Sequence, residues 1–269
     1  MGSTLVDAAG VRRLADRIRL RAVRMVAPHG FGYLGQALSS AEAVATLYST
    51  VYSRERDQLV CSPGHYIIAV FAAAAEAGLI DAESLSTYGF DDSTLEAIGT
   101  ERSPAVDLTC GSLGTGLSGA VGFALSQRLA ADDDARVFVL ASDGEMEEGQ
   151  VWEAALFAAH HRLSQLTVLI DANDSQVDGP VSSITTLEPL AAKWEAFGWD
   201  AHDVDGHDVA ALCDALQAAV LSDRPSVVIA RTSTRQGLDV LPPDADGHFI
   251  KLPPALAEDA IAELEARLV

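Results

Sequence analysis

The sequence predicts an α/β fold in which helices cover both faces of a mostly parallel sheet. Three segments are typical of buried strands, because each is short, apolar and rich in Val, Ile or Leu: residues 136–141, 166–171 and 226–231. Segments with helical periodicity separate these strands, and this alternation is typical of strand–helix–strand units with parallel strands. No linker, repeat or low-complexity tract divides the 269 residues, so residues 1–269 are predicted to form a single domain.

The first part of the chain is predicted to consist mainly of helices. They are expected at residues 5–27, 39–50 and 66–78. The glycine-containing stretch 28–36 separates the first two, and Ser39 or Ser40 is a candidate N-cap for the second. A short strand with its turn is expected at 57–65, before the third helix. Residues 81–108 show little periodicity and are expected to form a polar connection that is helical in pieces.

The rest of the chain alternates strands with helices. A helix rich in small residues is expected at 117–130, and such a helix can pack closely against a sheet or a partner helix. Further helices are expected at residues 150–163, 187–197, 208–221 and 254–267. A short strand at 199–204 adds to the three apolar strands named above.

The chain is strongly acidic and poor in cysteine. Its formal net charge of −21 argues against nucleic acid and anionic membrane surfaces as partners, although one local cation could still hold a small anionic ligand. Cys61, Cys110 and Cys213 show neither a disulfide framework nor zinc-ligand spacing. The sequence has no signal-peptide core and no apolar run of membrane-spanning length. We therefore expect a soluble cytoplasmic protein.

Two polar residues follow neighbouring predicted strands, where ligands bind in parallel sheets. Asp143 follows the strand at 136–141, and Asn173 follows the strand at 166–171. About one strand–helix–strand unit separates them, so their side chains are expected on the same rim. Carboxylate and carboxamide oxygens suit Mg²⁺ or Ca²⁺, and Mg²⁺ commonly carries a diphosphate. Alternatively, both are turn or N-cap residues, which are common after strands.

Three longer segments that contain or accompany this pair resemble transketolases. They are "CSPGH" (61–65), "TCGSLGTGLSGAVGFAL" (109–125) and "LASDGEMEEGQVWEAALFAAHHRLSQLTVLIDANDSQVDGP" (140–180). The last segment resembles the family's thiamine diphosphate motif, which has Gly-Asp-Gly after one strand and Asn after the next. Ser142 replaces the first glycine and is small enough to be tolerated. The resemblance covers most of residues 11–250 and is closest to the amino-terminal half of split, two-chain members.

The resemblance implies a thiamin diphosphate-binding fold that holds thiamine diphosphate and Mg²⁺. Asp143 and Asn173 would ligate the metal through side-chain oxygens, and Ser175 would ligate it through its backbone carbonyl. Two diphosphate oxygens and a water would complete the octahedron. Gly144 would let the diphosphate approach the backbone, because a side chain there would obstruct it.

The resemblance also implies the cofactor contacts. His65 matches a diphosphate-contacting histidine, and His248 matches a second one. Without that role, His65 would be a helix N-terminal residue facing solvent. Leu113 and Val177 match apolar residues that pack on the cofactor rings, although a plain core would also demand apolar residues there. The full implied set of cofactor-binding residues is His65, Gly111, Leu113, Gly114, Asp143, Gly144, Glu145, Asn173, Val177 and His248.

Two further acids match residues at the contact between two copies of this domain. Glu148 and Glu153 would link the two cofactor sites there, and with His65 and His248 they make up the implied catalytic group. Glu148 could instead belong to a solvated acidic helix start, where anions are favoured. Glu153 lies in the apolar stretch "VWEAALFAA", which makes a solvated role harder to explain.

Two substrate-binding positions depart from the family pattern. The family's "Ser-Gly-His-Pro-Gly" loop corresponds to "FGYLGQ", which places Tyr33 where a histidine is expected. His29 could take over only if the loop were rebuilt. A later "Gly-His-Pro" segment is replaced near "IGTERSP", with Thr100 in the approximate place of its histidine. These changes weaken the case for a housekeeping sugar-phosphate transketolase and leave the cofactor chemistry untouched.

The resemblance implies half of an active site. The family's ring-activating glutamate belongs to a pyrimidine-binding domain, and no second strand–helix series that could house it follows in this chain. A separate pyrimidine-binding subunit is therefore expected, in an α₂β₂ heterotetramer that self-associates through the diphosphate domain. The implied function is a transketolase-like transferase that moves a two-carbon ketol or acyl unit from a ketone to an aldehyde. The alternatives are the equivalent subunit of a 2-oxoacid decarboxylase or dehydrogenase, and a non-catalytic protein that keeps the fold for assembly or regulation.

Overall fold

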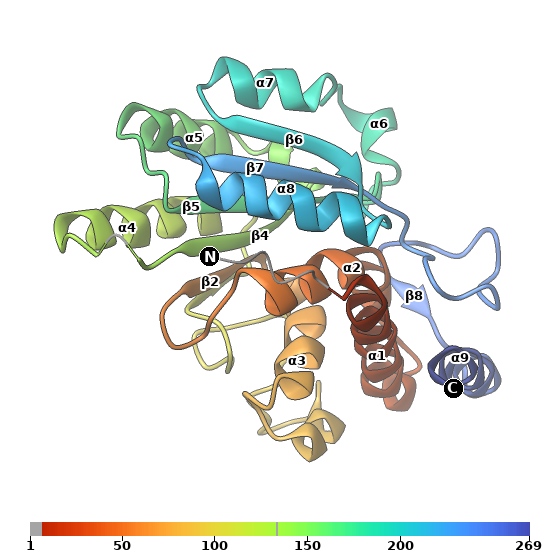
Figure 1. The fold of residues 1–269 in the computed structure, drawn as a ribbon. Helices are drawn as coiled ribbons and strands as arrows, with labels where there is room; N and C mark the ends of the chain where they lie inside the picture. Colours follow the sequence, from red (N-terminus) through yellow and green to blue (C-terminus); the bar gives the residue numbers. More distant parts are fainter. Residues whose placement is uncertain (1–6, 133) are drawn as a thin grey trace.

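The computed structural model describes residues 7–132 and 134–269. Its centre is a six-stranded parallel sheet with the strand order β3-β2-β4-β5-β7-β6 (Figure 1). The strands are β2 (Gln58–Pro63), β3 (Leu108–Cys110), β4 (Val137–Ser142), β5 (Leu166–Ala172), β6 (Asp200–Asp205) and β7 (Ser226–Arg231). The predicted α/β fold with a mostly parallel sheet is therefore confirmed.

Helices cover both faces of this sheet (Figure 1). One face carries α2 (Leu34–Thr50), α3 (Ile67–Glu76) and α8 (Val209–Leu221), with α1 (Ala8–Val26) and α9 (Pro254–Leu268) packed in the same core. The other face carries α4 (Thr115–Leu129), α5 (Gly149–His160) and α7 (Leu190–Ala196). A one-turn helix, α6 (Val181–Ile184), follows β5, and 3₁₀ turns occupy Ala27–His29, Gly64–Tyr66, Ala82–Thr87 and Gly144–Glu147. No helix in the described part of the chain combines the length and the hydropathy needed to cross a membrane.

Successive residues of each central strand enter opposite cores. In β4, Phe138 and Leu140 pack with the helices of the first face, whereas Val137 and Val139 pack with those of the second. Because both faces of the strand are buried, its sequence is apolar throughout and does not alternate with polar residues. Each such side chain contributes roughly 1.5–3 kcal/mol by leaving water. This two-sided burial explains why the central strands can be predicted from composition.

Helix α2 begins earlier than the sequence indicates. It starts at Leu34, so Ser39 and Ser40 lie inside the helix and neither is its N-cap. The prediction was wrong because the glycines before residue 39 look like a helix break in the sequence. Gly35 instead permits a close contact, since a Cβ there would lie 1.8 Å from the backbone oxygen of Gly247. The first turn of α2 therefore lies directly against the chain that precedes residue 248.

Two short strand pairings were not predicted. β3 pairs with β2 at the edge of the sheet, and β1 (Phe31–Gly32) pairs with β8 (Ile250–Lys251) in a separate antiparallel pair. Segments this short carry no usable periodicity. The other predicted helices and strands are confirmed, with ends shifted by a few residues. Residues 5 and 6 of the first predicted helix lie outside the described residues.

Candidate functional site

The predicted polar residues meet at the carboxyl edge of the sheet. Asp143 directly follows β4, and Asn173 follows β5, which is the next strand in the sheet. The amide of Asp143 donates to the carbonyl of Asp171 at 3.1 Å, which extends the pairing of the two strands to this edge. His65 follows β2, and His248 lies in the segment between β7 and β8. One crossover unit thus places the predicted pair side by side.

The carboxylate of Asp143 is buried and has no cationic partner among the described residues. Only 6% of its surface is exposed, and its oxygens accept bonds from the amides of Gly144 at 2.9 Å and Asp174 at 2.7 Å. Burial and the neighbouring Asp171 raise the pKa of Asp143 to about 7. No ion pair within the described residues includes Asp143, and none of their His, Cys, Asp and Glu side chains form a cluster of three or more that could hold a metal. A cation at Asp143 would offset the cost of burying this charge.

Hydrogen bonds fix the orientation of the Asn173 side chain. Its side-chain nitrogen lies 2.8 Å from Oδ2 of Asp171 and 3.0 Å from the hydroxyl of Tyr66. The nitrogen is therefore fixed toward the protein interior, and the oxygen accepts from the amide of Ser175 at 3.0 Å. An amide oxygen beside the Asp143 carboxylate is a hard donor set that fits Mg²⁺.

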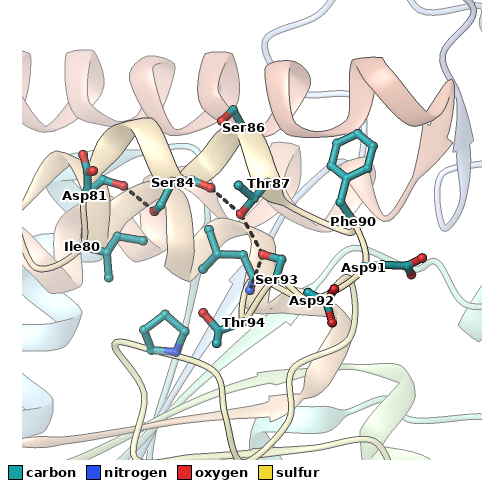
Figure 2. Close-up of a pocket in the computed structure, with 12 residues that line it drawn as sticks. Ile80, Asp81, Ser84, Ser86, Thr87, Phe90, Asp91, Asp92, Ser93 and Thr94 are labelled. Atoms are coloured by element: carbon teal, nitrogen blue, oxygen red, sulfur yellow. Dashed lines mark hydrogen bonds between the residues drawn. The ribbon is translucent and has the colours of Figure 1, made fainter.

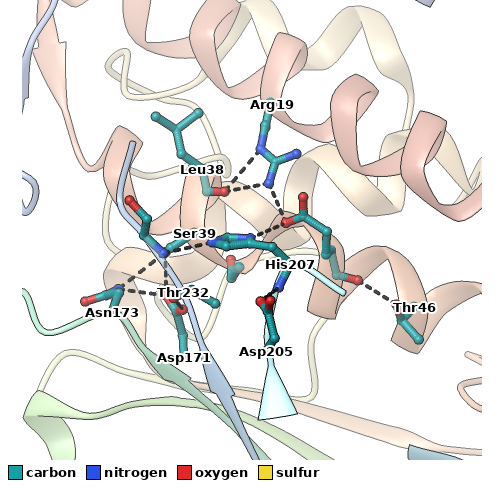
Figure 3. Close-up of polar contacts among 12 residues, drawn as sticks. Arg19, Leu38, Ser39, Thr46, Asp171, Asn173, Asp205, His207 and Thr232 are labelled. Carbon is teal, nitrogen blue, oxygen red and sulfur yellow. Dashed lines mark hydrogen bonds and ion pairs between the residues drawn. The ribbon is translucent and has the colours of Figure 1, made fainter. Parts of the chain in front are cut away.

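Asp171 is the centre of this hydrogen-bond network and was not predicted from the sequence (Figure 3). It accepts hydrogen bonds from the side chains of Ser39, Tyr66, Asn173 and Thr232. Burial raises its pKa, and these four bonds oppose the shift. The only sequence signal was an aspartate inside an otherwise apolar, fully buried strand.

A second set of polar contacts connects Arg19 to His207 beside the Asp171 network (Figure 3). Arg19, which is 2% exposed, bonds to Glu42, and Glu42 lies 3.2 Å from Nδ1 of His207. Burial raises the pKa of Glu42, but its bonds to His207 and Arg19 lower it further than burial raises it. Nε2 of His207 accepts from the amide of Ser233 at 2.9 Å. These contacts anchor the backbone next to Thr232, which bonds Asp171.

The two predicted histidines lie beside Tyr33. The ring centroids of His65 and His248 are 5.1 Å apart, and Tyr33 lies 5.1 Å from His65 and 5.7 Å from His248. Burial and then the neighbouring His248 lower the pKa of His65 to about 3, and burial also lowers the pKa of His248. Both rings are therefore neutral at pH 7, where each has one N–H to donate. His29 does not take over the position of Tyr33, since its ring bonds the carbonyl of Tyr88 at 2.7 Å.

Glu145 stabilises the glycine-rich loop before α4 through hydrogen bonds. One oxygen of this buried carboxylate accepts from the amide of Gly114 at 2.7 Å and from the hydroxyl of Ser62. Gly114 has φ +81°, and a Cβ there would lie 2.7 Å from Cβ of Glu148, so the turn requires glycine. Gly111 has open space where a side chain would be. Glu145 thus shapes the loop on which a cofactor would lie.

Replacing Glu145 by alanine is expected to loosen this loop. The two donors would lose their buried acceptor, which costs about 2 kcal/mol in the free energy of unfolding. Glu145→Gln keeps an acceptor oxygen at the same place and should cost less than about 1 kcal/mol. Urea unfolding of both variants would measure the difference, and hydrogen exchange at the Gly114 amide would locate it. Equal stability of the two variants would contradict this role of Glu145.

The remaining predicted residues do not converge on Asp143 within this chain. Val177 is 76% exposed, and Leu113 is half-buried. Glu148 and Glu153 are exposed, as are Leu156 and Phe157 of α5, at 60% and 42%. Glu148 lies against the turn at Gly114, but no ion pair within the described residues includes Glu148 or Glu153.

Two cavities lie near residues 80–111. Thr100 lines one of about 440 Å³, together with Thr109 and Gly111, and its hydroxyl donates to Glu96. The other, of about 650 Å³, lies beneath the Ala82–Thr87 turn (Figure 2). In the second cavity, the hydroxyls of Ser84, Ser86 and Thr87 bond to backbone carbonyls, and those of Thr87 and Ser93 bond to each other at 2.7 Å. Only the first cavity adjoins the glycine-rich loop.

Comparison with known proteins shows the family to which this chain belongs. The sequence model described as "Transketolase, thiamine diphosphate binding domain" matches residues 11–268. The chain belongs to the transketolase family. Its resemblance to the thiamine diphosphate motif is therefore confirmed at the level of the domain, and the chain is a transketolase-like subunit with a thiamine diphosphate-binding domain.

The transketolase relatives include proteins of about the same length. A transketolase family protein of Sinorhizobium fredii is 39% identical over 263 residues, which cover 94% of each chain. The 6-deoxy-6-sulfo-D-fructose transketolase subunit SqwG of a Clostridium strain is 35% identical and covers 93% of this chain and 94% of its own. An apulose-4-phosphate transketolase subunit of Actinobacillus succinogenes is 34% identical, with coverage of 81% and 82%.

Solved transketolases share the fold over part of their length. The transketolase of Campylobacter jejuni has a TM-score of 0.86 and 25% identity, and that of Leishmania mexicana has 0.82 and 27%. Each match covers 96% of this chain but only 43% and 41% of the transketolase. The chain therefore spans less than half of these larger transketolases.

Proposed function

We propose that this chain is the diphosphate-binding subunit of a two-chain transketolase-like enzyme that depends on thiamine diphosphate and Mg²⁺. The enzyme would transfer a two-carbon ketol or acyl unit from a ketone donor to an aldehyde acceptor. The observation that carries the proposal is the buried carboxylate of Asp143, which has no cationic partner among the described residues, beside the fixed side-chain oxygen of Asn173. A hard cation fits this donor set and would offset its electrostatic cost.

The residues around that pair are suited to hold the cofactor. Asp143, Asn173 and the carbonyl of Ser175 would hold Mg²⁺, while the neutral rings of His65 and His248 would donate to diphosphate oxygens. Backbone at Gly111, Gly114 and Gly144 would approach the diphosphate, Glu145 would support that loop, and Leu113 and Val177 would contact the rings. The bound cofactor supplies the carbon nucleophile for the transfer.

The rest of the site would come from other chains. Two relatives are named as transketolase subunits, which supports a partner here as well. We propose that residues 1–269 form the diphosphate domain alone and that a pyrimidine-binding subunit provides the ring-activating glutamate in an α₂β₂ assembly. Exposed Leu156 and Phe157 on α5 support self-association, with Glu148 and Glu153 at that contact. The three free cysteines fit a reducing cytoplasm.

A 2-oxoacid decarboxylase or dehydrogenase subunit remains a second candidate. Tyr33 packs against His65 and His248, so an aromatic ring occupies the place where the family has a donor-binding histidine. An aromatic wall favours a less hydroxylated donor than a sugar phosphate. Release of CO₂ from a 2-oxoacid by the assembled enzyme would select this candidate, and ketol transfer without CO₂ would reject it.

Calorimetric titration with thiamine diphosphate and Mg²⁺ tests the proposal. It would be run on this chain alone, on the chain with the partner encoded beside it, and on the same complex carrying Asp143→Ala. We expect tight Mg²⁺-dependent binding only when both chains are present, and none after the substitution. Unchanged binding by the Asp143→Ala complex would reject the site. No binding in any arm, with the complex shown to assemble by light scattering, would reject the cofactor assignment.

A further inference from the structure

Gln36 contacts His248 across 212 residues of sequence. Gln36 lies in the first turns of α2 and is 1% exposed. Its side-chain nitrogen lies 3.0 Å from the backbone oxygen of His248 and 3.1 Å from Nδ1 of the same residue. A carbonyl oxygen can only accept, so the group facing it is the NH₂ group, which can only donate. Nδ1 must then accept from the same NH₂ group, which leaves the ring proton on Nε2.

We propose that Gln36 is a positioning residue that fixes His248 as its Nε2–H tautomer and aims that N–H into the cofactor site. The part of this inference that concerns the cofactor rests on the proposed function. The tautomer itself follows from contacts within this chain alone.

The other neighbours of His248 agree with this assignment. Burial lowers the pKa of His248, and the Asp246 carboxylate and a hydrogen bond from the ring to the Ser175 backbone oppose that shift, so the Ser175 carbonyl faces a ring N–H. Because Nδ1 already accepts from Gln36, the N–H that faces this carbonyl is on Nε2, and the same N–H would donate to a diphosphate oxygen once the Ser175 carbonyl ligates the metal. Tyr33 stands edge-on to the ring, with an interplanar angle of 84°, and His65 lies on another side. The ring is therefore oriented toward Ser175, where the metal is proposed to bind.

The backbone holds Gln36 within reach of His248. The Gly35–Gly247 contact presses the first turn of α2 against the segment that carries His248. Within the described residues, the side-chain oxygen of Gln36 is buried without a hydrogen-bond partner. The carboxamide is thus held only by the two bonds that its nitrogen donates, both to His248.

Nitrogen NMR of the full chain tests the tautomer directly. Long-range ¹H–¹⁵N spectra of ¹⁵N-histidine-labelled protein would be recorded at pH 8, with His248→Gln used to assign the ring. We expect one neutral form with the proton on Nε2. Gln36→Met removes the donor and should give a mixture of tautomers. Gln36→Glu replaces the donor by an acceptor and should move the proton to Nδ1.

A matched control separates this effect from general loss of a buried carboxamide. Gln127 is also buried and donates to Gln58 at 3.0 Å, far from His248 in the fold, so Gln127→Met should leave the His248 spectrum unchanged. A wild-type ring protonated on Nδ1, or an unchanged ring in folded Gln36→Met, would overturn the inference. If Gln36→Glu fails to fold, the Gln36→Met comparison still decides.

Cofactor affinity tests the consequence separately. With the partner chain present, Gln36→Met should raise the Kd for thiamine diphosphate with Mg²⁺ by about 10-fold, as loss of a supporting partner does at other metal sites. An unchanged Kd would overturn the positioning role. If wild-type protein binds no cofactor while its ring has the expected tautomer, the proposed function fails and the tautomer assignment survives.

Discussion

Asp143→Asn is expected to abolish Mg²⁺-dependent binding of thiamine diphosphate and, at the same time, to stabilise the ligand-free chain at pH 8. Asparagine keeps the shape of the side chain but removes the charge that a metal would neutralise. Loss of this ligand should raise the Kd by about 100-fold or more, since even outer partners of metal sites contribute roughly 10–100-fold. Calorimetry on the two-chain complex would measure the loss.

The gain in stability follows from the pKa of the buried carboxyl group. Folding raises the pKa of Asp143 to about 7, whereas an unfolded aspartate titrates near 3.9. Between these values the folded chain binds more protons than the unfolded chain, so the free energy of unfolding falls as pH rises. The full cost is reached above about pH 7 and amounts to about 4 kcal/mol at most. Asp143→Asn removes it.

Urea unfolding at pH 5 and pH 8 tests whether the free energy of unfolding falls as pH rises. The stability advantage of Asp143→Asn over the wild type should be larger at pH 8 than at pH 5. Saturating Mg²⁺ should narrow the difference at pH 8, because the cation stabilises only the wild-type carboxylate. An advantage that does not change with pH would mean that Asp143 titrates normally and is not the buried charge described above.

Asp171→Ala is expected to destabilise the chain by about 3 kcal/mol. Four side-chain donors share this carboxylate, and those of Ser39, Tyr66 and Asn173 are buried, so the substitution removes a common acceptor from a largely buried network. The loss should appear as a lower urea midpoint with an unchanged slope. The Asn173 side chain would also lose the contact that fixes its orientation.

Two further variants allow the loss of stability in Asp171→Ala to be compared with that of milder substitutions. Asp171→Asn keeps one acceptor oxygen for Ser39, Tyr66 and Asn173, and should cost about 1 kcal/mol. Asp214→Ala removes an exposed aspartate of α8 and should stay within about 0.5 kcal/mol of wild type. If Asp171→Ala lost no more stability than Asp214→Ala, the hydrogen bonds to Asp171 would not stabilise the fold.

Features that depend on local sequence were predictable. The central strands stand out because two cores bury them on both sides, and one crossover unit suffices to bring Asp143 and Asn173 together. The start of α2 was mispredicted because Gly35 serves a contact with Gly247, far along the chain. A glycine that permits close packing looks the same in sequence as a glycine that ends a helix.

Features that depend on distant partners could not be predicted. Ser39 reaches Asp171 across 132 residues, and Gln36 reaches His248 across 212. Neither pair has a spacing or composition that marks it. The family resemblance names the residues expected to touch the cofactor, but Gln36 and Asp171 act through those residues, and only their three-dimensional contacts reveal them.

The site at the carboxyl edge of the sheet, here called the rim, is built from segments that lie far apart in the sequence, and this affects the order in which the chain can fold. Loop closure costs more entropy as the loop lengthens, and contacts between distant residues form slowly. The rim consists of α2, the turns after β2, β4 and β5, and the segment before β8. It is therefore complete only when the two halves of the chain have packed together. The sheet can thus be largely assembled while the rim is still open. Contacts that formed only at that stage would have little effect on the rate of folding and would mainly control the rate of unfolding.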